Sequence, residues 1–237
     1  MTNPRPQVIV FDVNETLSDL APIGRRFQEV GAPEHLGQLW FTSVLRDGFA
    51  LAAAGSSQTF ADIAAALLRV QLPEPELNRS LPEAIAHVMD GFAELGVHPD
   101  VVDGVRALAG AGLRLVTMSN GAATVAERLL TAAGIVDSFE ALLSVEDAGV
   151  WKPARAAYGY ALERCGVAPR DAMLVAVHPW DINGARRAGL ATAWINRDGR
   201  SYPAHLFPAD LVASSILSLA EQLGHSHPGA LNQPKGK

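Results

Sequence analysis

Short apolar segments that alternate with amphipathic ones constrain this chain more than any other feature. From about residue 96 onward, apolar runs such as residues 113–119 and 172–177 are separated by segments with helical spacing. This alternation is typical of parallel strands joined by crossover helices, with helices covering both faces of the sheet. The sequence therefore predicts an α/β protein built on a parallel sheet.

The individual elements can be placed from turn and helix signals. Gly134 ends one predicted helix and Pro153 opens another. The first strand is an apolar run that stops on Asp12, as expected for a buried parallel strand. The predicted strands span residues 8–12, 113–119, 139–145, 172–177 and 191–196, and the predicted helices span residues 122–133, 154–165 and 181–188.

Residues 17–94 have a different pattern. Ala and Leu recur there at helical spacing, as in residues 61–68, and no strand is evident. An all-helical insertion directly after the first strand would cover the strand ends as a cap. We therefore predict a core of residues 1–16 and 95–223, a helical cap of residues 17–94 and a flexible tail of residues 224–237.

Composition limits the class of protein and its partners. Hydrophobic residues make up 49% of the 237 residues, and the net charge is −6, which indicates a globular protein without nucleic acid as its main partner. A small anionic substrate remains compatible with this charge. The single Cys165 allows no internal disulfide, and no segment approaches the ~20 apolar residues of a membrane span. We expect a cytoplasmic protein without a membrane anchor.

Four polar segments follow predicted strands. They begin at Asp12, Ser119, Lys152 and His178, the last of them including Asp181. Each has an ordinary interpretation alone, as a helix cap, a turn or a solvated charge. Because the carboxyl ends of parallel strands open on one edge of a sheet, these side chains are expected to converge there.

The order and spacing of these residues resemble the haloacid dehalogenase superfamily over residues 7–200, least closely in the cap. The resemblance implies a Rossmann-like core with an inserted helical cap. Its motifs place an aspartate nucleophile at Asp12, a hydroxyl at Ser119, a lysine at Lys152 and an acidic residue at Asp181. Within that superfamily, Thr16, Tyr158 and the run of residues 192–197 resemble the L-2-haloacid dehalogenase branch, haloacid dehalogenase type II.

Asn14 separates dehalogenase from phosphatase chemistry. Phosphatases of this superfamily usually place a second aspartate two residues after the nucleophile, where it acts as a general acid. The amide of Asn14 has no such proton to give, and a halide leaving group needs neither a proton nor a metal. We therefore predict a hydrolytic dehalogenase of short 2-haloacids that needs no cofactor. The alternatives are a Mg²⁺-dependent phosphatase of small phosphomonoesters and a non-catalytic binding protein on the same scaffold.

The resemblance also implies a role for each residue of the site. Asp12 attacks the carbon that bears the halogen, and Lys152 keeps its carboxylate ionised. Thr16 and Ser119 hold carboxylate or ester oxygens, while the backbone N–H groups of Val13 and Asn14 bind the substrate carboxylate. Asp181 is expected to orient or activate the water that hydrolyses the ester, and to pair with Lys152. The remaining expected substrate contacts are Asn120 and Phe60 as neighbours of the halide, Tyr158, and Trp180 as a wall of the pocket.

Some positions depart from the dehalogenase pattern. The branch carries a halide-binding arginine directly after a Leu-Trp pair in the cap, whereas Leu39-Trp40 is followed here by Phe41. Arg46 could replace that arginine or be a plain surface charge. His178 could be a general base for ester hydrolysis or a histidine that shapes the loop. Dimers are frequent in the family, so a homodimer is an option that the sequence does not decide.

Overall fold

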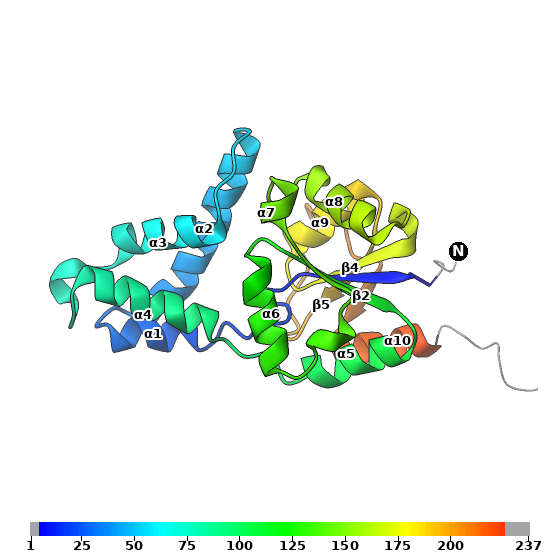
Figure 1. The fold of residues 1–237 in the computed structure, drawn as a ribbon, viewed down its shortest axis with the longest axis horizontal. Helices are drawn as coiled ribbons and strands as arrows, with labels where there is room; N and C mark the ends of the chain where they lie inside the picture. Colours follow the sequence, from blue (N-terminus) through cyan, green and yellow to red (C-terminus); the bar gives the residue numbers. More distant parts are fainter. Residues whose placement is uncertain (1–4, 226–237) are drawn as a thin grey trace, which may run out of the picture.

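A six-stranded parallel sheet forms the centre of the molecule in a computed structural model that describes residues 5–225 (Figure 1). The strand order is β3-β2-β1-β4-β5-β6, which places β1 between β2 and β4. The predicted α/β fold with a parallel sheet is confirmed. The strands are β1 (Val8–Phe11), β2 (Arg114–Ser119), β3 (Ala141–Ser144), β4 (Ala172–Ala176), β5 (Ala191–Ile195) and β6 (Leu211–Ala213).

Helices cover both faces of this sheet. One face carries α5 (Val101–Gly110), α6 (Ala123–Ala132) and α10 (Ile216–His225), and the other carries α8 (Arg155–Cys165) and α9 (Pro179–Ala188). Short turns of helix connect these elements. They are α7 (Val145–Ala148), η2 (Val136–Ser138) and η3 (Pro169–Asp171).

Burial on both faces of the sheet explains why every residue of β1 is apolar. Successive side chains of a strand point to opposite faces, so Ile9 and Phe11 pack with α5 and α10 while Val8 and Val10 pack on the other side. All four residues are at most 1% exposed. A polar residue within the strand would be buried without a partner, whereas Asp12 comes just where the strand ends.

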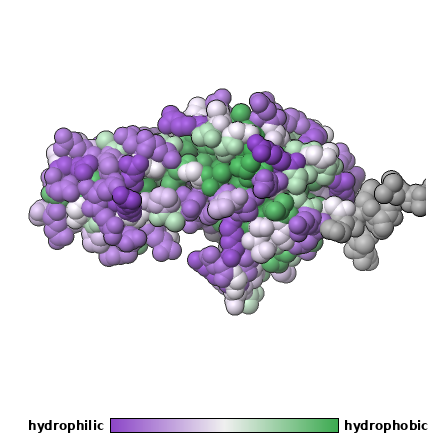
Figure 2. Space-filling model, turned by 90° about the horizontal axis from the view of Figure 1, so that it is seen from below, coloured by the Kyte–Doolittle hydropathy of each residue, from purple (hydrophilic) through white to green (hydrophobic). Residues whose placement is uncertain are grey.

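The helical insertion lies beside the carboxyl ends of the strands (Figure 1). Its core contains the rings of Trp40, Phe41, Phe60 and Phe92. The face of this part that is seen in Figure 2 is mostly hydrophilic. Its elements, which we call the cap, are α1 (Ile23–Glu29), α2 (Leu36–Ala53), α3 (Phe60–Gln71), η1 (Glu74–Glu76) and α4 (Leu81–Ala93).

Two chain segments connect the cap to the core, and they pair with each other. Ser18 and Val97 form an isolated antiparallel bridge. The N–H of Asp19 donates to the carbonyl of Gly96 at 2.8 Å, and the N–H of His98 donates to the carbonyl of Leu17 at 3.0 Å. We call this pair of segments, residues 17–19 and 96–98, the hinge ribbon.

The elements differ in detail from the sequence predictions. Helix α9 begins at Pro179 rather than Asp181, because proline is suited to the first turn of a helix. Strand β3 stops at Ser144, whose hydroxyl caps α7 by accepting the N–H of Glu146. Strand β6 and helix α10 were not predicted, and α10 extends over Gly224 and His225. Residues 226–237 of the predicted tail lie outside the described residues.

Within residues 5–225, no helix has the length and apolar character needed to cross a bilayer.

Candidate active site

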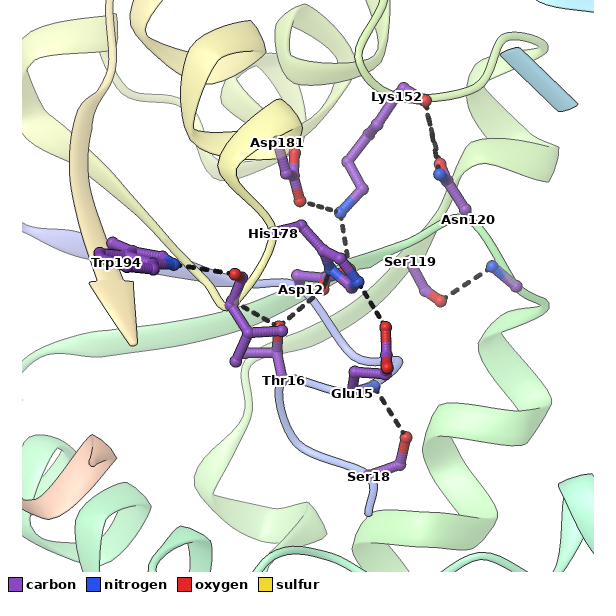
Figure 3. Close-up of polar contacts among 12 residues, drawn as sticks. Asp12, Glu15, Thr16, Ser18, Ser119, Asn120, Lys152, His178, Asp181 and Trp194 are labelled. Carbon is purple, nitrogen blue, oxygen red and sulfur yellow. Dashed lines mark hydrogen bonds and ion pairs between the residues drawn. The ribbon is translucent and has the colours of Figure 1, made fainter. Parts of the chain in front are cut away.

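The site lies at the carboxyl edge of the sheet, where loops from neighbouring strands meet (Figure 3). Asp12 follows β1, Ser119 ends β2, and His178 follows β4 as the residue before α9. Lys152 reaches the same place from the loop before α8. The structure therefore brings the four strand-end segments together, as the parallel sheet requires.

The Asp12 carboxylate is 4% exposed and has three side-chain donors. Lys152 Nζ lies 2.9 Å from Oδ1, while Thr16 Oγ1 and His178 Nδ1 lie 2.7 and 3.0 Å from Oδ2. Thr16 is itself held by the N–H of Val177, which donates to Oγ1 at 3.1 Å. Each carboxylate oxygen is therefore oriented by a charged or fixed group.

These contacts decide the charge state of Asp12. Burial alone would raise the pKa of this carboxyl, but the Lys152 ammonium and the hydrogen bonds from His178 and Thr16 outweigh burial and hold the pKa well below its usual range. Burial likewise opposes the charge of Lys152, yet Asp12 and Asp181 raise the pKa of its ammonium. Asp12 is an anion at neutral pH.

Asp181 is the second carboxylate that binds the Lys152 ammonium. Its Oδ2 accepts from Lys152 Nζ at 2.6 Å and its Oδ1 accepts from the Tyr158 hydroxyl at 2.6 Å. Burial and the nearby charge of Asp12 raise the pKa of Asp181, and burial together with Asp181 raises the pKa of Tyr158 well above its ordinary value. Both oxygens of Asp181 are occupied, so its evident role is to hold Lys152.

His178 bridges two carboxylates. Besides its bond to Asp12, its Nε2 lies 2.8 Å from Oε2 of Glu15. Burial would lower the pKa of this imidazole, but the hydrogen bonds to Asp12 and Glu15 raise it to about 10. The imidazolium therefore donates from both nitrogens. Glu15 was missed by the sequence reasoning, and its position between Asp12 and Thr16 was the available signal.

Ser119 and Asn120 organise the loop after β2. The Ser119 hydroxyl accepts the N–H of Gly121 at 2.9 Å. The Asn120 amide bonds the backbone of Lys152 in both directions, accepting from its N–H at 3.0 Å and donating to its carbonyl at 3.4 Å. Asn120 thus fixes the peptide from which the Lys152 side chain extends to Asp12.

The other predicted contacts lie around this centre at different distances. Val13 and Asn14 are buried in the loop after Asp12. The Trp180 ring lies 5.9 Å from Lys152 Nζ and packs against His178 and Phe49. Phe60 stacks on Trp151, the neighbour of Lys152. Aromatic rings therefore form the wall on the cap side.

The structure does not bring Arg46 to the site. Its guanidinium is 66% exposed and pairs with the adjacent Asp47 at 2.7 Å. Phe41, at the position of the expected arginine, is 2% exposed and packs against Phe60 and Phe92. The space into which an arginine would extend from this position is occupied by aromatic rings.

Arg197 is a second residue that the sequence reasoning did not single out. It follows β5, and its guanidinium donates to the Thr16 carbonyl at 3.0 Å and pairs with Asp100 at 3.0 Å. Arg197 thereby ties the loop of Asp12 to the start of α5. The sequence drew attention to residues 192–197, which resemble the dehalogenase branch. It did not indicate that Arg197 contacts Thr16 and Asp100.

The carboxylates around Asp12 are bound by protein donors. Oxygens of Asp181 and Glu15 that face the centre are bound by Lys152, Tyr158 and His178. Among residues 5–225, no group of three or more His, Cys, Asp or Glu side chains could hold a metal ion. The cations that neutralise this centre are the chain's own ammonium and imidazolium.

Comparison with known proteins agrees with this geometry. Residues 6–189 match the family model described as haloacid dehalogenase-like hydrolase. The match spans more than half of the chain, and the chain belongs to this family of hydrolases. The predicted superfamily is confirmed.

The names of individual relatives are more specific about activity than the description of the family model. A (S)-2-haloacid dehalogenase of Pseudomonas putida is 29% identical over 198 residues, which are 83% of this chain and 87% of that protein. Haloacetate dehalogenase H-2 of Moraxella sp. (strain B) is 27% identical, with 83% and 88% covered. A crystal structure of an L-2-haloacid dehalogenase superposes with a TM-score of 0.85 at 28% identity, covering 92% of this chain and 99% of that one.

Proposed function

We propose that this chain is a hydrolytic dehalogenase of short 2-haloacids that works through an ester on Asp12. One observation carries the proposal. A buried aspartate, held as an anion by Lys152, Thr16 and His178 within 3.0 Å, has an amide rather than an acid two residues later. Such a site holds a nucleophile ready and offers no general acid at that position, which suits a leaving group that departs as an anion.

The first step forms the ester. An oxygen of the Asp12 carboxylate attacks the carbon that bears the halogen, the carbon–halogen bond breaks, and the halide leaves with the bonding electrons. Backbone N–H groups of Val13 and Asn14 and the side chain of Ser119 orient the substrate carboxylate and the Asp12 oxygens. The aromatic wall of Phe60 and Trp180 excludes water, so that the carboxylate attacks in a medium of low polarity.

The second step hydrolyses the ester, and we assign the base to His178. Esterification removes the negative charge of Asp12, which is one of the two anions that keep the imidazole protonated. The pKa of His178 then falls, because a neighbouring opposite charge is lost. His178 releases its proton to solvent and then takes a proton from the water that attacks the ester carbonyl carbon. When the tetrahedral intermediate collapses, the bond to the 2-hydroxy acid breaks and the departing oxygen takes the remaining hydroxyl proton, so that the Asp12 carboxylate re-forms beside the imidazolium.

Asp181 supports this chemistry through Lys152. Since its two oxygens are taken by Lys152 and Tyr158, it holds the ammonium 2.9 Å from Asp12 in both steps. No step requires a cofactor or a metal.

The activity is tested with 2-chloropropionate, fluoroacetate and a generic phosphomonoester, each with Mg²⁺ or with chelator. We expect halide release that chelator leaves unchanged. Phosphate release that chelator abolishes would favour the phosphatase, and release of neither ion would favour a binding protein.

The ester on Asp12 is tested by single turnover in H₂¹⁸O with enzyme in excess. Water attacks the carboxyl carbon of Asp12, so one ¹⁸O is expected in the peptide that contains Asp12 and none in the hydroxy acid after the first turnover. Label found directly in the product would instead show that water attacks the substrate carbon, and the ester mechanism would be wrong.

A further inference from the structure

Glu15 has an unusual backbone for its residue type. Its φ is +61°, and among the described residues it is the one position other than glycine with a positive φ. Left-handed backbone is unfavourable for a residue with a side chain, so it persists where surrounding contacts impose it. The Glu15 side chain is also the second partner of His178, at 2.8 Å.

Contacts from the hinge ribbon impose this conformation. His98 Nε2 donates to the Glu15 carbonyl at 3.0 Å, and the Glu15 N–H donates to Ser18 Oγ at 3.3 Å. His98 is fixed in turn, because its own N–H donates to the Leu17 carbonyl. Both peptide groups that flank the Glu15 side chain are therefore held by residues where the cap joins the core.

A pocket of about 400 Å³ is lined by Glu15 and His178. His98, Trp194 and Arg200 also line this pocket. The Glu15 side chain is 37% exposed, so its carboxylate can turn into solvent if the backbone relaxes. The position of Glu15 therefore depends on its peptide contacts as well as on its bond to His178.

We propose that His98 is a positioning residue for the reaction and acts through Glu15. By holding the Glu15 backbone in the left-handed region, it keeps the carboxylate on His178 and so keeps the imidazole oriented toward Asp12. The contacts of His98, Glu15 and His178 run in sequence from the hinge ribbon to the Asp12 carboxylate. This inference rests on the proposed role of His178 in ester hydrolysis and adds the residue that holds its partner in place.

Few groups face His178, so a change in its titration is simple to interpret. Asp12 and Glu15 are bonded to its two nitrogens, the Trp180 ring packs on it, and Lys152 acts on it through Asp12. Replacing His98 changes none of these groups chemically. A change in the titration of His178 therefore reports a change in the position of Glu15.

The experiment is a double-mutant cycle with His98→Ala and Glu15→Gly, read by NMR titration of His178 and by steady-state kinetics. Glycine accepts the positive φ, so Glu15→Gly removes the carboxylate without backbone strain. We expect Glu15→Gly to lower the pKa of His178 by about one to three units, and His98→Ala to lower it in the same direction. We expect kcat to fall by at most about 10²-fold in each variant.

The diagnostic result is non-additivity. In the Glu15→Gly background, His98→Ala should change neither the His178 titration nor kcat, because the carboxylate it positions is absent. His98→Gln, whose amide can still donate, should restore part of kcat. Additive effects, or an unchanged His178 titration in His98→Ala, would overturn the proposal.

Two controls distinguish a failure of this inference from a failure of the proposed function. His205→Ala, at an exposed histidine, should leave titration and kcat unchanged. The titration does not require turnover, so a wild-type protein that released no halide would contradict the proposed function while the cycle still decided the role of His98.

Discussion

The core and the cap contribute opposite kinds of side chain to the same site. The core supplies ions in hydrogen-bond contact, with Asp12, Lys152 and Asp181 each at most 4% exposed. The cap supplies aromatic rings, Phe49 against Trp180 and Phe60 against Trp151. Buried charges are tolerated only where partners are fixed in place, and the ends of paired strands provide that rigidity. The aromatic rings need no partner and exclude water.

The largest effect on activity is expected from removing the charge of the Asp12 carboxylate. Asp12→Asn should reduce halide release by at least about 10⁴-fold, because the amide is not a nucleophile. The fold should remain, since the amide fills the same space. Circular dichroism and thermal unfolding check the fold, with Asp137→Asn at an exposed aspartate as the matched control. Full turnover by Asp12→Asn would remove Asp12 from the mechanism.

Removing the shared cation should destabilise the protein as well as inactivate it. Lys152→Met keeps the length of the side chain but leaves Asp12 and Asp181 buried without the ammonium between them. Breaking a buried ion pair on one side costs about 3–5 kcal/mol, which urea unfolding would measure at pH 7. Since protonating the orphaned carboxylates relieves the repulsion, the loss should be smaller at pH 4. An equal loss at both pH values would contradict the ionic account.

The aromatic packing of the cap is tested by placing a charged side chain in it. Phe41→Arg should lower the free energy of unfolding by at least about 3 kcal/mol, since an unpaired guanidinium would replace a ring that is 2% exposed. Phe41→Leu should cost only about 1–3 kcal/mol. If Phe41→Arg is as stable as Phe41→Leu, the cap already contains room and a partner for an arginine.

His178 should make stability depend on pH in the alkaline range. Its folded pKa of about 10 lies above its ordinary 6.5, so the folded state binds the proton more tightly. This contribution is fully present below pH 6.5 and is lost as the pH rises from 6.5 to 10. His178→Gln should show a flatter fall of stability over that range in urea unfolding. Identical pH profiles would show that His178 is not held as an imidazolium.

The smallest effect is expected at Arg46. Its guanidinium is exposed and bonded only to the neighbouring Asp47 in the contacts described. Arg46→Ala should leave kcat, KM and the melting temperature unchanged within error, because exposed ion pairs contribute little. A raised KM for haloacid would instead place Arg46 on the substrate path.

Much of this architecture could be predicted because it depends on local patterns. Apolar runs and helix signals placed five of the six strands, and strand ends alone indicated that Asp12, Ser119, Lys152 and Asp181 converge. Strand β6 has three residues, of which Val212 is 53% exposed. Its apolar run of three residues is too short to be recognised as a strand from the sequence.

The sequence by itself determined the sheet, the insertion of helices after β1 and the residues at the sheet's edge, because periodicity and strand ends are properties of neighbouring residues. Only the tertiary structure decided which of these groups touch. Glu15 meets His178 across 163 positions, and Arg46 points to solvent, although both lie near the expected motifs. Contacts between distant segments depend on backbone conformation at single residues, such as the positive φ of Glu15, and on how the cap packs on the core.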